Sequence, residues 1–439
     1  MATLSTCLKS LPHPSSPPTS TPRPVRPALN HQSLSSRYLG FVTGGVLPIA
    51  EAADNLVSAV DQNVQGNRER GCGWAGRTFT TGATASNILG LACGRESVIA
   101  RRLSPSSFSQ TVAELGLLGA CQAAGVRGIQ VLTSMGHSSL YKAASVVGLG
   151  HASVKEMGVS EAEPWRLDLD KVERALEEGE RDGVASVVVV SAGEVNTGRF
   201  ATNVLDMPKL RSLADRYGAW VHVDGAFGIF ARALPRTDEF LSLHAHVAGL
   251  ELADSIAADG HKLLNVPYDN GIFLCRDASI LTQVFSNPNA VYLASPGDPN
   301  AILSPLNIGI ENSRRFRALP VYAVLLSEGR EGIAAMLSRM VLLARAIAAY
   351  VRDSEHYEWL PEEDASLEST YIIVLFRAKD AGLNEVLVDR INASGKMFVS
   401  GTKWGGKRAV RIAVGSWRVD VERDAAVIKE ALTEIAEGR

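Results

Sequence analysis

The sequence predicts an α/β fold in which a mainly parallel sheet forms a large domain, followed by a smaller α+β domain at the C-terminus. Three observations support this class. The chain has 439 residues, 46% of them hydrophobic, and can bury a large core. Short apolar runs alternate with helical stretches, as in a parallel sheet covered on both faces. A long helical stretch then precedes a region with a different pattern.

The large domain is expected to begin with a helix at residues 47–64, and a second helix opens after the small-residue turn at residues 82–91. The predicted strands lie at residues 129–133, 186–190 and 219–223, and helices are expected at residues 170–180 and 206–217. Ligands of such sheets bind beyond the carboxyl ends of the strands, where Thr133, Ser191 and Asp224 fall.

A long helix is predicted from residue 317 to about 353, leading out of the sheet. The α+β unit after it has expected strands at residues 370–376 and 409–414 and helices near residues 383–393 and 421–436. We therefore divide the chain into a large domain at residues 37–316 and a connecting helix with a small domain at residues 317–439. Residues 1–36 are rich in Ser and Pro without any Asp or Glu, a composition shared by organelle transit peptides and by disordered tails. The many prolines work against the amphipathic helix of a mitochondrial presequence, so we interpret the segment as a disordered tail.

Composition excludes several classes of function. A formal charge of -3 and a pI near 6.3 leave no basic field for nucleic acid. The apolar runs have strand length, far below the roughly 20 residues of a membrane span. The five cysteines are scattered without close pairs, which argues against a disulfide framework and against a zinc or other metal site. A reducing, cytoplasmic location is expected.

The residues with the clearest chemical signal centre on Lys262, which directly follows His261. Upstream, Asp224 ends an apolar strand. A Lys placed in this way is the arrangement expected where an amine holds pyridoxal 5'-phosphate (PLP) as a Schiff base. We interpret Lys262 as that amine; the alternative is an exposed surface lysine.

Further segments at residues 222–226, 265–271, 313–319 and 411–417 accompany this pair. In this order and spacing they resemble the PLP-dependent group II amino-acid decarboxylases, which include the aromatic amino-acid and glutamate decarboxylases. The resemblance runs from about residue 37 to the C-terminus. It implies a fold type I PLP enzyme, similar to aspartate aminotransferase, and a homodimer with active sites at the subunit interface.

By this resemblance, Asp224 would lie beside the pyridine nitrogen of PLP and keep it protonated. Ala226 would leave room for the ring, and His137 would stack on it. Ser191 would hydrogen-bond near Asp224 or the cofactor. The alternatives are a capping Asp at the end of a strand and a hydrogen-bonded loop His.

The resemblance places the cofactor phosphate against Gly82, Ala83 and Thr84, where backbone N–H groups and a helix dipole favour an anion. Without the resemblance, this turn would be only an N-cap. His261 and Asp259 would border the phosphate. Asp259 departs from the aromatic amino-acid decarboxylases, which have an amide there, and an acid beside a phosphate is unfavourable unless it points away.

Four arginines resemble family arginines near the domain junction: Arg314, Arg315, Arg317 and Arg411. They could bind a carboxylate through two hydrogen bonds, or form a salt bridge between domains. Residues 37–45 resemble the part of the family that lines the substrate pocket, although most of the N-terminal helical arm is missing.

Two other features depart from the family. The aromatic decarboxylases carry a Tyr in a mobile loop that protonates the carbanion, and residues 293–307 contain none. A helical segment of relatives is also missing between residues 65 and 78, through divergence or through an error in the gene prediction.

We therefore expect decarboxylation of an L-amino acid to an amine and carbon dioxide through a Schiff base on Lys262. The missing loop Tyr motivates an alternative, aldehyde-forming or other PLP carbanion chemistry. The short segment motivates another, a non-catalytic homologue that pairs with an active relative. The expected partners are an amino-acid substrate and a second copy of the chain. The sequence does not name the substrate.

Overall fold

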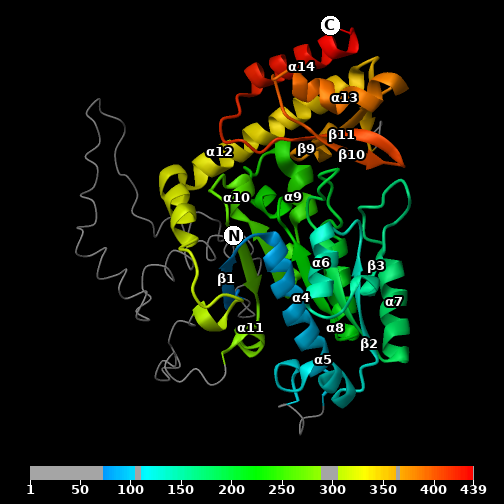
Figure 1. The fold of residues 1–439 in the computed structure, drawn as a ribbon, viewed down its shortest axis with the longest axis vertical. Helices are drawn as coiled ribbons and strands as arrows, with labels where there is room; N and C mark the ends of the chain where they lie inside the picture. The colour runs from blue at the N-terminus through cyan, green and yellow to red at the C-terminus, as the bar shows by residue number, and fades with distance from the viewer. Residues whose placement is uncertain (1–72, 104–109, 288–304, 362–365, 439) are drawn as a thin grey trace, which may run out of the picture.

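The computed structural model describes residues 73–103, 110–287, 305–361 and 366–438. The expected tail at residues 1–36, the segment at residues 37–45 and the helix at residues 47–64 lie outside these ranges. Figure 1 shows the described chain as a large sheet flanked by helices, with α12 leading to a smaller unit that holds the C-terminus.

The large sheet has seven strands in the order β1-β7-β6-β5-β4-β2-β3. They are β1 (Gly76–Thr80), β2 (Gly128–Thr133), β3 (Val154–Glu156), β4 (Val184–Ser191), β5 (Trp220–Asp224), β6 (Ser255–Asp259) and β7 (Gly271–Cys275). The neighbouring strands from β3 to β6 pair in parallel, whereas β7 pairs antiparallel with both β6 and β1. The expected mainly parallel sheet is therefore confirmed.

Helices cover both faces of this sheet. The helices of this unit are α4 (Ala83–Ala100), α5 (Val112–Ala123), α6 (Ser138–Val146), α7 (Leu169–Asp182), α8 (Asp206–Arg216), α9 (Leu241–Val247), α10 (Gly260–Leu263) and α11 (Ala278–Phe285). Alternate residues of β4 point to opposite faces. Val187 and Val189 belong to the core that includes residues of α4, and Val188 and Val190 to the core that includes residues of α7 and α8.

The smaller unit is a four-stranded antiparallel sheet in the order β10-β11-β9-β8. Its elements, with the long helix that precedes it, are α12 (Ala318–Asp353), β8 (Tyr357–Leu360), β9 (Ile373–Ala378), α13 (Ala381–Ala393), β10 (Ser400–Trp404), β11 (Lys407–Ala413) and α14 (Val421–Ala436). The helices and strands expected in α12 and this smaller unit are present, with boundaries shifted by up to three residues. The division at residue 317 stays a prediction.

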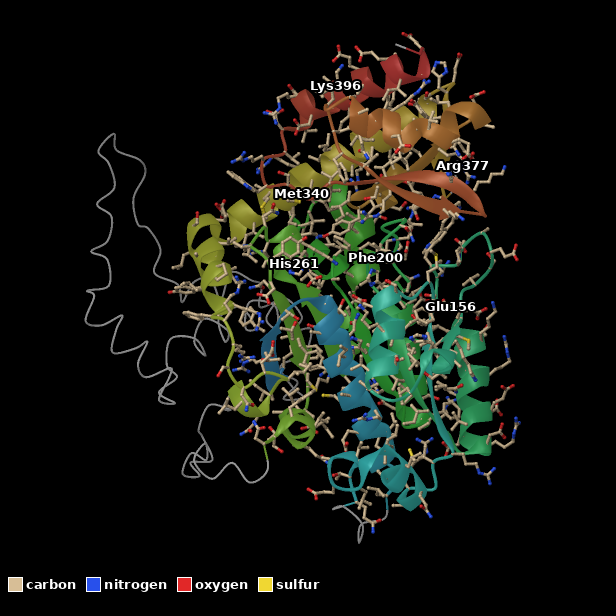
Figure 2. The ribbon with its side chains drawn as sticks, viewed as in Figure 1. Glu156, Phe200, His261, Met340, Arg377 and Lys396 are labelled. Carbon is tan, nitrogen blue, oxygen red and sulfur yellow. The ribbon has the colours of Figure 1, made fainter. Side chains whose placement is uncertain are left out.

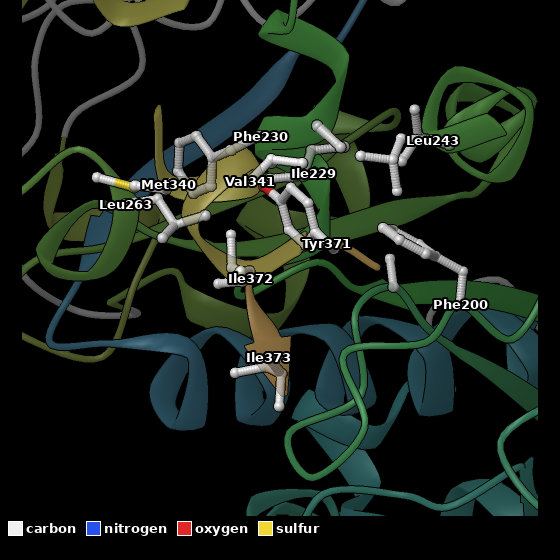
Figure 3. Close-up of a cluster of buried hydrophobic side chains, with 14 of the residues drawn as sticks. Phe200, Ile229, Phe230, Leu243, Leu263, Met340, Val341, Tyr371, Ile372 and Ile373 are labelled. Carbon is white, nitrogen blue, oxygen red and sulfur yellow. The ribbon is translucent and has the colours of Figure 1, made fainter. Parts of the chain in front are cut away.

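One described helix, α12, is long and apolar enough to span a membrane by length and composition alone. More than half of its most apolar window is buried inside the protein, as in a core helix. Figure 3 shows Met340 and Val341 of α12 among Phe230, Leu263 and Tyr371. These side chains belong to the core that the large unit shares with the smaller one.

Candidate active site

A cavity of about 470 Å3 lies where β4, β5 and β6 end. Its lining includes all nine residues that the sequence analysis assigned to the cofactor: Gly82, Ala83, Thr84, His137, Ser191, Asp224, Ala226, His261 and Lys262. Asp259 lines it as well. Figure 2 shows His261 on the side of the large sheet that faces the smaller unit. The structure thus brings these side chains together, while their individual roles stay predictions.

Strand ends explain this convergence. Ser191 is the last residue of β4 and pairs with Asp224, the last residue of β5. β6 ends at Asp259, and the short helix α10 begins at the next residue and carries Lys262. Parallel strands bring their carboxyl ends to one edge of the sheet, so these side chains meet there although they are far apart in sequence.

The amine of Lys262 has two defined neighbours. Its Nζ lies 3.0 Å from Oδ2 of the buried Asp259. It also lies 4.0 Å from the ring centroid of Phe227, within the range of a cation–π contact. The amine therefore sits inside the cavity, so the alternative of an exposed surface lysine does not hold.

The carboxylate of Asp224 is held by two donors. Asn87 Nδ2 donates to Asp224 Oδ2 at 2.9 Å, and the backbone N–H of Ala226 donates to Oδ1 at 3.3 Å. Asn87 is fully buried on α4. These contacts fix the carboxylate at the edge of the cavity, where it can accept a hydrogen bond from a protonated group of a ligand.

The turn before α4 forms a close-fitting cradle. A Cβ on Gly82 would lie 3.2 Å from His261 Cε1, so a larger residue would crowd the imidazole. A phosphate bound at this turn would require the Asp259 carboxylate to point away from it, but the carboxylate points toward the turn. Its Oδ1 accepts a hydrogen bond of 2.6 Å from the backbone N–H of Ala83, the first residue of α4.

His261 is oriented by its neighbours. The backbone N–H of Asn270 donates to His261 Nδ1 at 3.1 Å, which places the proton of the neutral ring on Nε2. That Nε2 lies 3.6 Å from Asp259 Oδ1. The ring of Tyr268 lies 4.4 Å from the His261 ring, centroid to centroid, and 76% of Tyr268 is exposed.

Sequence reasoning did not assign several residues of this site: Thr81, Asn87, Ser139, Gly193, Val195, Phe227 and Tyr268. Asn87 carried a usable signal, because it lies four residues after Ala83 and therefore on the same face of α4. Tyr268 lies in the segment at residues 265–271 that resembles the family, but the segment did not give it a role. Phe227 carried no comparable signal, since an aromatic residue after a strand is more often part of the core.

None of the four predicted arginines lines the cavity. Arg314 donates to Thr78 Oγ1 at 2.7 Å, and both Arg315 and Arg317 pair with Asp269. The Nε of Arg411 donates to the backbone carbonyl of Val195, a cavity residue. Arg411 thus links β11 to the large unit, but through a carbonyl and not through a salt bridge. The loop at residues 293–304 lies outside the described residues, as do residues 65–72.

The residues present fit PLP. An amine inside the cavity, a fixed carboxylate and a helix N-terminus surround a space within the usual range for cofactor pockets. Among the described residues that line the cavity, Asp259 alone stands against the fit, because it already accepts a hydrogen bond from the Ala83 N–H. The fold and this arrangement define a PLP-dependent enzyme of the α/β class.

Residues 63–379 match the pyridoxal-dependent decarboxylase conserved domain. The match covers more than half of the chain, and the chain belongs to this family. PLP is the family's cofactor, and the expected resemblance is confirmed.

The chain is 28% identical over 376 residues to L-2,4-diaminobutyrate decarboxylase of Acinetobacter baumannii, covering 83% of this chain and 69% of that protein. It is 26% identical to tyrosine decarboxylase 4 of Petroselinum crispum, covering 67% and 57%. It is also 26% identical to phenylacetaldehyde synthase of Petunia hybrida, covering 64% and 55%. The chain thus spans between about half and just over two thirds of the length of these relatives.

Solved structures share the fold. The crystal structure of Oryza sativa TDC with PLP and tryptamine superposes with a TM-score of 0.74 at 22% identity, covering 93% of this chain and 80% of that one. Rhodiola rosea 4-hydroxyphenylacetaldehyde synthase gives a TM-score of 0.71 at 18% identity, covering 98% and 91%. At these identities the likeness concerns the fold alone, and it confirms the expected α/β architecture.

Proposed function

We propose that this protein binds PLP in the cavity and decarboxylates an L-amino acid to an amine and carbon dioxide. The observation that carries the proposal is the meeting of Lys262, Asp224 and the start of α4 around one cavity in a member of the decarboxylase family. When bound, PLP supplies an electron sink for the bond broken at the amino acid's α-carbon.

The chain's own residues have separate tasks in this proposal. Lys262 would hold the cofactor covalently and release it to the substrate amine, since its Nζ lies inside the cavity. Asp224 would keep a proton on the ring nitrogen, because a carboxylate favours a positive charge beside it. The N-terminus of α4 would attract the phosphate through its dipole and backbone N–H groups.

Borohydride trapping tests the central assignment without relying on activity. Reduction of the PLP-loaded protein should attach the cofactor to the peptide that contains Lys262, as detected by mass spectrometry. The Lys262→Ala variant should lose this adduct and its decarboxylase activity, while the exposed Lys403→Ala variant should keep both. A Lys262→Ala protein that forms product at the normal rate would refute the proposal.

The substrate needs a panel of amino acids. We propose that the panel begin with 2,4-diaminobutyrate and tyrosine, because two relatives are named as decarboxylases of these amino acids. Aliphatic and acidic amino acids complete it. An amine and carbon dioxide in equal amounts would establish the reaction together with the substrate class. No product and no bound cofactor would favour the non-catalytic homologue.

An aldehyde-forming reaction is the second candidate, favoured by the Petunia hybrida relative and by the absence of Tyr from residues 293–307. In this reaction the amino acid, dioxygen and water give an aldehyde, carbon dioxide, ammonia and hydrogen peroxide. Dioxygen consumption that matches carbon dioxide release would identify it. An amine formed without dioxygen uptake would exclude it.

We further propose that the protein is a homodimer in the cytoplasm. Exposed apolar side chains at Ile310, Leu319 and Leu326 support an association surface at the start of α12. The described cysteines, Cys93, Cys121 and Cys275, are free thiols, which fits a reducing compartment. Light scattering at micromolar concentration tests the dimer, and cell fractionation tests the location.

A further inference from the structure

A continuous series of hydrogen bonds runs through the core behind the cavity. Trp220 Nε1 donates to Ser255 Oγ at 3.0 Å, and that oxygen lies 2.8 Å from His222 Nδ1. His222 Nε2 lies 3.0 Å from Asn87 Oδ1, and Asn87 Nδ2 donates to Asp224. The Trp, Ser, His and Asn side chains are at most 2% exposed. Water therefore does not share these contacts.

A second branch starts at the same amide. Asn87 Nδ2 also donates to Ser139 Oγ at 3.1 Å. Ser139 Oγ lies 2.7 Å from His137 Nδ1, and the backbone N–H of Ser139 donates to this nitrogen at 3.2 Å. His137 itself is exposed and lines the cavity. One buried amide thus contacts, directly or through one hydroxyl, the two cavity side chains Asp224 and His137.

The direction of each hydrogen bond follows from its two ends. A carboxylate only accepts, so the amide of Asn87 must turn its NH2 group toward Asp224 and its oxygen toward His222. His222 Nε2 must then carry a proton. Burial lowers the pKa of His222 to about 4, so the ring is neutral near pH 7 and carries no proton besides the one on Nε2. Its Nδ1 accepts from the hydroxyl of Ser255, whose oxygen accepts in turn from Trp220.

The same reasoning reaches His137. Ser139 Oγ accepts one proton of the Asn87 amide, which leaves the hydroxyl proton of Ser139 for His137 Nδ1. The backbone N–H of Ser139 points at the same nitrogen. His137 Nδ1 therefore receives two donors and carries no proton in the neutral ring. The proton of the neutral imidazole lies on Nε2.

We propose that Asn87 is a positioning residue for the decarboxylation, which holds Asp224 as a pure acceptor and sets the tautomer of His137 through Ser139. This inference rests on the proposed function of the cavity, and it assigns a task to a residue that the sequence analysis left without one. His137 then presents an N–H donor from Nε2, and Asp224 keeps its free lone pairs for a ligand proton. Asn87 itself does not line the cavity.

Nitrogen NMR of the protein labelled with 15N-histidine tests this assignment directly. The spectra separate protonated from unprotonated ring nitrogens, and His137→Gln identifies the signals of His137 among those of the nine histidines. At mildly alkaline pH we expect wild-type His137 as the Nε2–H tautomer. Ser139→Ala removes the hydroxyl donor and Asn87→Leu removes the group that directs it, so in both variants the share of the Nδ1–H tautomer should rise, while the backbone N–H of residue 139 keeps part of the ring in the Nε2–H form. A wild-type ring protonated on Nδ1, or variants with an unchanged tautomer, would overturn the proposal.

Cofactor binding separates the two branches. Asn87→Leu removes the donor to Asp224 and should weaken PLP binding about tenfold, because it leaves buried polar groups without partners. Ser139→Ala should weaken PLP binding less than Asn87→Leu does, since Asp224 keeps its donors. Equal PLP affinity in wild type and Asn87→Leu would overturn the part of the proposal that concerns Asp224.

A matched control shows whether the loss of any buried amide would change the tautomer of His137 or the affinity for PLP. Gln130 is a buried amide on β2 that hydrogen-bonds Ser186 Oγ at 3.0 Å, outside the cavity. Gln130→Leu should change neither the tautomer of His137 nor PLP affinity. The NMR signature does not depend on turnover. A normal tautomer pattern without decarboxylation would therefore refute the proposed function alone.

Discussion

Asp259 lies 3.0 Å from Lys262 Nζ through one carboxylate oxygen and 2.6 Å from the Ala83 backbone nitrogen through the other. The carboxylate is 2% exposed, so neither contact is weakened by bulk water. An internal anion thus occupies the helix N-terminus that a phosphate is expected to use. PLP binding has to tolerate this negative charge or displace it.

Replacing Asp259 with Asn should therefore tighten PLP binding. The amide oxygen can still accept from the Ala83 N–H, while the charge that repels a phosphate is gone. We expect about a tenfold lower dissociation constant, equal to roughly 1.4 kcal/mol, measured by titrating the apoprotein with PLP and following the cofactor's absorbance.

Asp254→Asn is the matched control for this variant, because Asp254 precedes β6 and pairs with Arg211 at 3.0 Å, outside the cavity. It should lower the stability without changing PLP affinity. Weaker PLP binding in Asp259→Asn would show that the carboxylate serves the cofactor, for example by orienting Lys262.

The buried His222 should make the protein sensitive to acid. Burial lowers its pKa to about 4, while the nearby Asp224 acts in the opposite direction. An unfolded His has a pKa of about 6.5. Between these two pKa values, His222 binds a proton in the unfolded chain but not in the folded chain. The free energy of unfolding therefore falls as the pH falls. The loss amounts to about 3 kcal/mol when the pH reaches 4.

Urea unfolding at several pH values checks this expectation. His222→Gln keeps a donor and an acceptor but cannot titrate, so its stability should fall less steeply than that of the wild type between pH 6.5 and pH 4. Burial also lowers the pKa values of His244 and His246, but both residues are present in the two proteins. Parallel pH profiles would contradict the prediction.

The contact between α4 and His222 leaves no room for a methyl group at Gly90. A Cβ there would lie 2.4 Å from His222 Cε1 and 2.6 Å from Nδ1. Gly90→Ala should therefore destabilise the protein by about 2 kcal/mol and displace the ring that holds Asn87. Chemical unfolding measures the first effect and PLP titration the second. Gly128→Ala, where the nearest atom is 3.9 Å away, should be neutral.

The sequence predicted the elements whose signal is local. β4 was found because its valines form a continuous apolar run, and α14 because its apolar face repeats with helical spacing. β1 and β7 were missed, since β1 is stable only through pairing with residues almost 200 positions away. Such pairing leaves no local pattern.

The site divides in the same way. Lys262 and Asp224 were predicted because short motifs surround them, and the structure places both in one cavity. The contact of Asn87 with Asp224 joins residues 137 positions apart, and its partner could not be inferred from either segment. The orientation of Asp259 toward Ala83 also depended on the packing of β6 beside α4.

Tyr268 is the one phenol among the described residues that line the cavity. Its ring contacts that of His261, and a phenol can deliver a proton to a carbanion in place of the Tyr that residues 293–307 lack. Tyr268→Phe removes only the hydroxyl and keeps the ring contact. We expect slower amine formation, by about a hundredfold, and a larger share of aldehyde among the products, with PLP affinity unchanged.

Product analysis by mass spectrometry, together with a dioxygen electrode, measures both changes in Tyr268→Phe. Tyr141→Phe is the matched control, because the Tyr141 hydroxyl donates to Glu156 and lies outside the cavity lining. That variant should keep the wild-type rate and product. If Tyr268→Phe also forms the amine at the wild-type rate, the proton comes from another donor, and the Nε2–H of His137 is then the described group to test next.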